Sequence, residues 1–130
     1  MVAAMWRDCG ADVCTLSIAQ HDAIFAQVSH LPHLLAYALV HQMLNSPFSE
    51  ESFSMAAGGF ADFSRIASSS PQMWHDIALA NASAIIESIE TYQTHLDQLK
   101  TFIKEKDSES LLSFMQGAKQ RRDEWIRNKG

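Results

Sequence analysis

One arginine stands alone in the middle of this sequence. Between Arg7 and Lys100 there are ten acidic residues and a single cationic one, Arg65. It falls in FADFSRIASSSPQMW (60–74), three residues after Asp62. A planar guanidinium suits two-point binding of a carboxylate, whereas i, i+3 spacing on a helix permits an ion pair with Asp62. Two roles are therefore open for Arg65: an anchor for an anion, held in place by Asp62, or a structural ion pair.

The histidines are a second group of interest, because the chain has six of them. His30 and His33 stand at i, i+3 and project from one side of a helix. A metal site needs three or four converging ligands, and no nearby carboxylate completes such a set, so we expect no metal. The two imidazoles either bind backbone groups freed by Pro32 or line a polar pocket. Trp74 is either a core residue or the apolar wall of that pocket.

Composition excludes several classes of protein. The net charge of −5 argues against a nucleic-acid-binding surface. The most apolar run, residues 31–44, is shorter than the roughly 20 residues that a bilayer requires, so we expect no membrane role. Cys9 and Cys14 have no second pair, which fits neither a zinc site nor a disulfide framework. We expect reduced thiols in a cytoplasmic protein.

These side chains must be positioned by helices, because the fold class that the pattern predicts is all-α. Apolar spacing of three and four predicts a long helix over residues 18–46, buried on most sides and kinked at Pro32. A second helix is predicted from about Glu50 to Ser68, across Gly58 and Gly59. The paired glycines indicate a close approach of another backbone or a ligand, or a break in the helix.

A long helix is predicted from the Ser70-Pro71 start to about Lys106, and Asp107 caps a final one. Six apolar residues of the long helix recur with coiled-coil spacing: Ile85, Ile89, Tyr92, Leu96, Leu99 and Ile103. We expect long helices packed antiparallel, with this seam lying across a dimer interface.

The N-terminus predicts a different kind of structure. A helix is expected to stop at Gly10, and a short strand to follow over residues 11–16. A lone strand ahead of helices has no sheet to join. We therefore expect the chain to be the C-terminal part of something longer, with Met1 inside an α/β unit.

Two long motifs resemble one known family. HDAIFAQVSHLPHLLAYALV (21–40) and AGGFADFSRIASSSPQMWHDIALAN (57–81) resemble the C-terminal helical domain of prephenate dehydrogenases and of the related arogenate (cyclohexadienyl) dehydrogenases. Ala61, where arginine is common in that family, removes one positive charge near Arg65. The resemblance implies that residues 1–16 are the remnant of a dinucleotide-binding domain, and that 17–130 form a helical substrate-binding and dimerisation domain.

The resemblance also implies a reaction and a set of roles. The parent enzyme would use NAD or NADP to decarboxylate prephenate oxidatively to 4-hydroxyphenylpyruvate, or to act on arogenate, in tyrosine biosynthesis. Its catalytic base would lie in the missing domain, so the isolated chain should be inactive. Arg65 would anchor a substrate carboxylate and Asp62 would orient it. His30 and His33 would be hydrogen-bond donors and Trp74 would border the pocket. Weaker candidates behind these are Ser29, His21 and Asp22.

Two alternatives compete with this homodimeric enzyme. The chain could be a non-enzymatic helical interaction module, in which Arg65 pairs with Asp62 and the apolar seam mediates assembly. It could also be a regulatory unit that binds tyrosine as a feedback inhibitor through the same arginine. Competition between tyrosine and prephenate would distinguish the regulatory unit.

Overall fold

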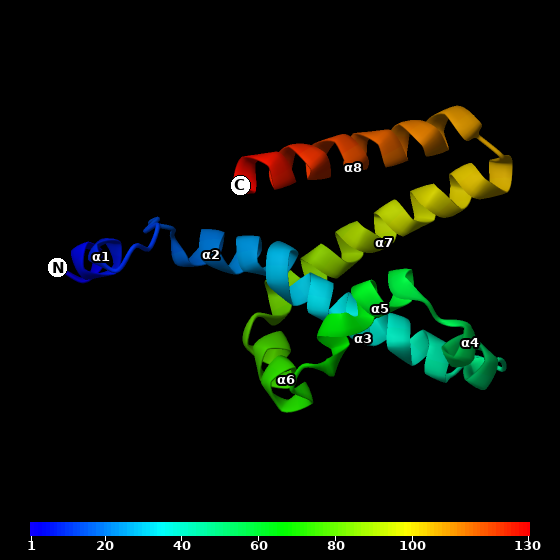
Figure 1. Cartoon of the computed structure of the whole chain (residues 1–130), viewed down its shortest axis with the longest axis horizontal. Coiled ribbons are helices and arrows are strands. Elements are labelled where there is room, and N and C mark those ends of the chain that lie inside the picture. The colour runs from blue at the N-terminus through cyan, green and yellow to red at the C-terminus, as the bar shows by residue number, and fades with distance from the viewer. The chain divides into compact units, whose positions relative to one another are not determined.

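The computed structural model describes residues 1–130, and every regular element in it is a helix, which confirms the predicted all-α class. The helices are labelled in Figure 1. They are α1 (Val2–Asp8), α2 (Ile18–Phe25), α3 (Leu31–Leu44), α4 (Ser49–Met55), α5 (Gly58–Ser64), α6 (Pro71–Ala80), α7 (Ala82–Glu105) and α8 (Ser108–Lys129). A π-helical turn (Ala26–His30) joins α2 to α3, and a 3-10 turn (Arg65–Ser68) follows α5. The chain divides into two compact units, residues 1–88 and 89–130.

The first unit is built on one continuous helix, formed by α2, the π turn and α3 (Figure 1). Ser17 and Gln20 close a capping box at its start. The expected irregularity near Pro32 takes the form of the π turn, in which the Leu31 N–H donates to the carbonyl of Ala26. Pro32 then lies in the first turn of α3, directly after the π turn.

The prediction that this helix is buried on most sides is wrong for this chain alone. Only Ala26 and Ala36 are buried along it, because too few elements of this chain cover its apolar sides. The whole helix, Ile18–Leu44, spans 27 residues and is long and apolar enough to cross a membrane. The apolar run at residues 31–44, on which the prediction of no membrane role rested, covers only part of it. Length and composition alone are weak evidence, because the core helix of a soluble protein passes the same test.

Four short elements pack on this helix, and three of them, α5, the 3-10 turn and α6, carry the second motif. α3 contacts α4, α5 and the 3-10 turn, and α6 contacts the π turn. The Tyr37 hydroxyl donates to the Ser69 carbonyl at 2.7 Å and so fixes the segment that enters α6. Ser70 then caps α6 by accepting from the Met73 N–H, as predicted. The packing therefore holds the start of α6 against the middle of the long helix.

Two predicted helices are each divided in the structure. The one expected over 50–68 breaks at Ala56, whose backbone is extended, and α5 begins at Gly58. A Cβ added at Gly58 or Gly59 would meet nothing within 4 Å, so the glycines accompany a break and not a close approach within this chain. The helix expected over 71–106 is interrupted at Asn81, with φ −116° and ψ 36°.

The strand predicted over residues 11–16 does not form. The helix does stop just before Gly10, at Asp8, and Gly10 adopts φ 84°, in the region that favours glycine. The residues that follow have no regular structure, because a strand requires a neighbouring strand to pair its backbone groups and this chain supplies none. Whether residues 1–16 belong to a preceding domain stays a prediction.

The second unit is a helical hairpin. The part of α7 from Ile89 onward runs antiparallel to α8 (Figure 1), and Asp107 caps α8 by accepting from the Ser110 N–H at 3.0 Å. Phe102 and Phe114 meet edge to face, with ring centroids 6.4 Å apart. No residue of this unit is buried. In the predicted seam, Leu96 is 48% and Ile103 62% exposed, because two helices cannot cover each other on all sides.

Candidate functional site

Three of the predicted site residues meet between the long helix and α6. The His33 ring stacks on Trp74, with centroids 3.7 Å apart and an angle of 17° between the planes. His30 approaches the same indole edge-on at 6.0 Å and 70°. Trp74 is only 6% exposed, whereas both histidines are half-buried. The two imidazoles and the indole therefore form one aromatic cluster, His30–His33–Trp74.

Hydrogen bonds hold both histidines of this cluster. His33 Nδ1 lies 2.8 Å from the carbonyl oxygen of Ser29, one turn earlier. This bond agrees with the interpretation in which a histidine binds backbone near Pro32. It also means that Nδ1 is the protonated nitrogen, so the free nitrogen of neutral His33 is an acceptor and not the donor we expected.

Asn81 joins the cluster although the sequence analysis did not single it out. Its side-chain Nδ2 donates to the Asp22 carbonyl at 3.0 Å and lies 3.2 Å from His30 Nδ1. In the sequence, Asn81 is only the last residue of the second motif (57–81). Its contribution depends on the break between α6 and α7, which the sequence pattern did not predict.

The neighbourhood of His30 disfavours its charged form. Burial lowers the pKa of His30 below its ordinary value of 6.5, repulsion from His21 and His33 lowers it further, and Asp22 acts in the opposite direction. His21 Nδ1 lies 3.1 Å from the Asp22 carboxylate, and the two side chains are largely exposed. His30 is therefore held neutral by its surroundings near pH 7.

Trp74 retains an unused polar atom. Its indole Nε1 is buried and has no hydrogen-bond partner in the chain, which costs about 1–3 kcal/mol when no acceptor is supplied. An apolar groove of about 230 Å³ also borders this side chain. The groove is lined by Leu34, Tyr37, Pro71, Trp74, His75 and Ala78. The cluster thus combines an apolar wall with a buried donor that no group of this chain satisfies.

Arg65 and Asp62 are both exposed, and neither makes an ion pair or a hydrogen bond within the chain. The structural ion pair between them is therefore not formed. No hydrogen bond, ion pair or ring contact joins either residue to the aromatic cluster. Arg65 instead presents an unpaired guanidinium in the 3-10 turn that leads from α5 toward α6.

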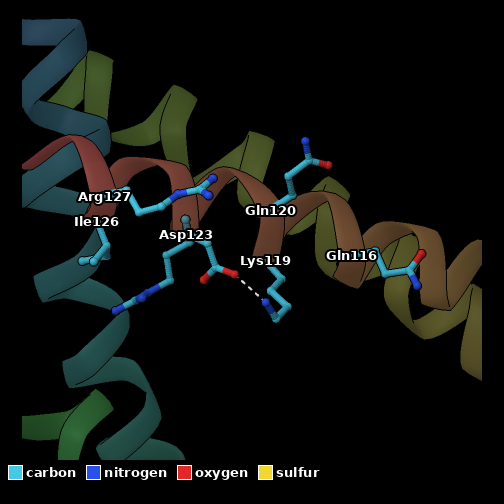
Figure 2. Close-up of a pocket in the computed structure, with 7 residues that line it drawn as sticks. Gln116, Lys119, Gln120, Asp123, Ile126 and Arg127 are labelled. Carbon is cyan, nitrogen blue, oxygen red and sulfur yellow. Dashed lines mark hydrogen bonds and ion pairs between the residues drawn. The ribbon is translucent and has the colours of Figure 1, made fainter.

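A larger hollow, of about 570 Å³, lies along α8 and is shown in Figure 2. All of its lining residues come from that one helix: Gln116, Lys119, Gln120, Arg122, Asp123, Ile126 and Arg127. Lys119 and Asp123 pair along the helix, as the dashed line in Figure 2 marks. Because long, solvated side chains of a single helix enclose it, this hollow has no built binding geometry.

No group of three histidine, cysteine or acidic side chains converges in the structure. Cys9 and Cys14 are free and exposed. The chain also has no strand followed by a glycine-rich G-x-G-x-x-G turn, so its residues do not compose a dinucleotide-binding unit.

Comparison with known proteins identifies close relatives. A prephenate dehydrogenase from Bacillus subtilis (strain 168) is 38% identical over 112 residues, which cover 83% of this chain and 29% of that protein. A cyclohexadienyl dehydrogenase from Zymomonas mobilis is 34% identical over 115 residues, or 85% of this chain and 39% of that protein. The chain therefore spans well under half the length of these relatives.

A solved structure agrees with the sequence comparison. It is prephenate dehydrogenase from A. aeolicus in complex with hydroxyphenyl propionate and NAD+, with a TM-score of 0.89 and 39% identity, covering 95% of this chain and 43% of that one. The family described as "Prephenate dehydrogenase, dimerization domain" matches residues 17–117. This match includes the aromatic cluster, Asn81 and Arg65. The chain belongs to the prephenate dehydrogenase dimerization-domain family.

Proposed function

We propose that this chain is the dimerisation and substrate-pocket portion of an NAD(P)-dependent prephenate or arogenate dehydrogenase of the cytoplasm. With prephenate, the ring hydroxyl loses a proton and its carbon gives a hydride to NAD(P)+. The ring carboxylate leaves as CO2 and the resulting phenolate oxygen takes a proton back, so that 4-hydroxyphenylpyruvate and NAD(P)H result. The base and the cofactor-binding residues belong to the part of the enzyme that this chain lacks.

The observation that carries this proposal is the family match over residues 17–117, because it contains every residue of the aromatic cluster. The A. aeolicus relative was solved with hydroxyphenyl propionate, which has an aromatic ring and a carboxylate. Such a molecule needs an apolar wall, a few directed polar groups and a cation. Trp74 can supply the apolar wall, His30 and His33 the polar groups, and Arg65 the cation.

We assign one role to each of these side chains. Arg65 anchors a carboxylate of the substrate, since it has no ion pair of its own in the chain. Asp62, three residues earlier, orients the guanidinium when substrate binds. His30, His33 and Trp74 border the ring of the substrate, and the buried Trp74 Nε1 is a donor that has no acceptor in the chain.

The proposed enzyme is a homodimer. The hairpin of residues 89–130 buries none of its residues, although its seam carries apolar side chains such as Leu96 and Ile103. A second copy packed along the seam would remove this surface from water. Each Å² of apolar area buried in this way would stabilise the dimer by about 25 cal/mol. The family description names this domain for dimerisation, which supports the same assignment.

The test is steady-state reduction of NAD+ and of NADP+ by the full-length protein that contains this chain, with prephenate and with arogenate in turn. Formation of 4-hydroxyphenylpyruvate and CO2 in step with NAD(P)H is expected with prephenate. Tyrosine belongs in the assay as an inhibitor, because it shares the phenol ring and a carboxylate with the product. A folded, dimeric protein that reduces neither cofactor with either acid would contradict the proposal.

A further inference from the structure

The contacts of Asn81 determine which way its amide group faces. A backbone carbonyl can only accept, so the atom 3.0 Å from the Asp22 oxygen must be the NH2 group of Asn81. That same nitrogen lies 3.2 Å from His30 Nδ1. Its second hydrogen is therefore directed at an imidazole nitrogen, and that nitrogen has to be unprotonated to accept it.

The same reasoning fixes His33 in the opposite form. His33 Nδ1 faces the Ser29 carbonyl at 2.8 Å and must carry the proton. Neutral His33 thus has its lone pair at Nε2, whereas neutral His30 has its proton at Nε2. Two imidazoles one turn apart, both against Trp74, are held as opposite tautomers by different partners.

We propose that Asn81 is a positioning residue that holds His30 as the neutral Nε2–H tautomer, so that the cluster offers one donor, at His30, beside one acceptor, at His33. Through Nε2, His30 can then donate to a bound molecule and His33 can accept from one. A carboxylate has no proton to give and would satisfy His30 alone.

The groups around His30 support this state. The titratable groups that act on it, His21, Asp22 and His33, all belong to the same continuous helix. From the other side, Trp74 of α6 and Asn81 after α6 add no charge. Burial lowers the pKa of His30, and a donor aimed at Nδ1 stabilises the same neutral form. Only Asn81 distinguishes between the two neutral tautomers.

The first test is the tautomer itself, observed by solid-state ¹⁵N NMR of the full-length protein labelled at its imidazole nitrogens. Comparison with His30→Gln identifies the His30 pair of signals. We expect Nδ1 in the unprotonated region and Nε2 in the protonated region, and the reverse for His33. A protonated Nδ1 on neutral His30 in the wild-type protein would overturn the proposal without any variant of Asn81.

The second test changes Asn81. In Asn81→Asp a carboxylate oxygen faces Nδ1, so the Nδ1 signal should move to the protonated region and the pKa of His30 should rise. Asn45→Asp is the matched control, since Asn45 also follows a helix and its Nδ2 donates to a backbone carbonyl, that of His41, at 2.8 Å. It should leave His30 unchanged. An unchanged tautomer in a folded Asn81→Asp protein would refute the assignment.

The role of this donor–acceptor pair in the pocket rests on the proposed function, and kinetics separate the two. If the tautomer changes in Asn81→Asp and kcat/KM for prephenate falls relative to Asn45→Asp, both are supported. If the tautomer changes while kcat/KM stays equal to that of the control, Asn81 still positions His30. His30 would then lie outside the substrate pocket, and that part of the proposed function would be wrong.

Discussion

Replacing Arg65 should separate an effect on ligand binding from an effect on stability. The side chain is exposed and has no ion pair or hydrogen bond in the chain. Surface substitutions of this kind usually change the free energy of unfolding by no more than about 0.5 kcal/mol. We therefore expect the Tm of Arg65→Ala to stay close to that of the wild-type protein.

The kinetic effect should be much larger. Truncating one partner of a hydrogen-bonded charge pair costs about 2–5 kcal/mol, which corresponds to a loss of roughly 30-fold or more in kcat/KM. Arg65→Lys keeps the charge but loses the planar fork, so it should fall between alanine and wild type. The assay is nicotinamide reduction by the full-length enzyme with prephenate over a range of concentrations.

Arg122→Ala is the matched control, because Arg122 is an exposed arginine of α8, on the hairpin of residues 89–130. It should change neither Tm nor kcat/KM. If Arg65→Ala matched this control in kcat/KM, Arg65 would not bind the substrate. If instead Arg65→Ala lowered Tm by several degrees, the arginine would be structural, through a partner outside this chain.

Three other outcomes follow from burial, exposure and charge. Trp74→Ala should lower the free energy of unfolding by about 3–5 kcal/mol in a denaturant titration, because Trp74 is 6% exposed. Trp125→Ala should change it little, because Trp125 is 49% exposed. Equal effects would show that the burial of Trp74 does not stabilise the fold. Leu96→Glu should weaken the dimer by about 1.5–3 kcal/mol per copy in sedimentation experiments. Gln93→Glu adds the same charge without removing an apolar side chain, so it should not weaken the dimer. Identical dissociation constants for the two variants would place the dimer interface elsewhere. The pKa of His30 is lower in the folded state than its ordinary value of 6.5, so the unfolded chain binds the proton first as the pH falls. The contribution of His30 to stability should therefore decline as the pH drops through about 6.5 and be constant above it. His30→Gln should remove part of the slope of Tm against pH in this range. A slope that is identical in both proteins would show that His30 does not contribute.

The helical class and the helix starts were determined by local sequence. Serine or aspartate followed by helix-forming residues caps a helix through bonds within one turn, so Ser70 and Asp107 could be assigned without tertiary information. Gly10 ended its helix for an equally local reason, its positive φ. The aromatic and histidine motif was also visible, since His30 and His33 have helical spacing.

What the tertiary structure decided is which atoms of these residues are free to bind a ligand. The break at Asn81 places an amide against the Asp22 carbonyl and His30, residues more than 50 positions earlier. Helical periodicity contains no information about such a contact, because it depends on how α6 packs against the π turn. The same packing left Arg65 unpaired where i, i+3 spacing allowed a bond with Asp62. Sequence thus determined the helical class, several helix starts and the types of side chain, and packing determined which of these side chains meet one another.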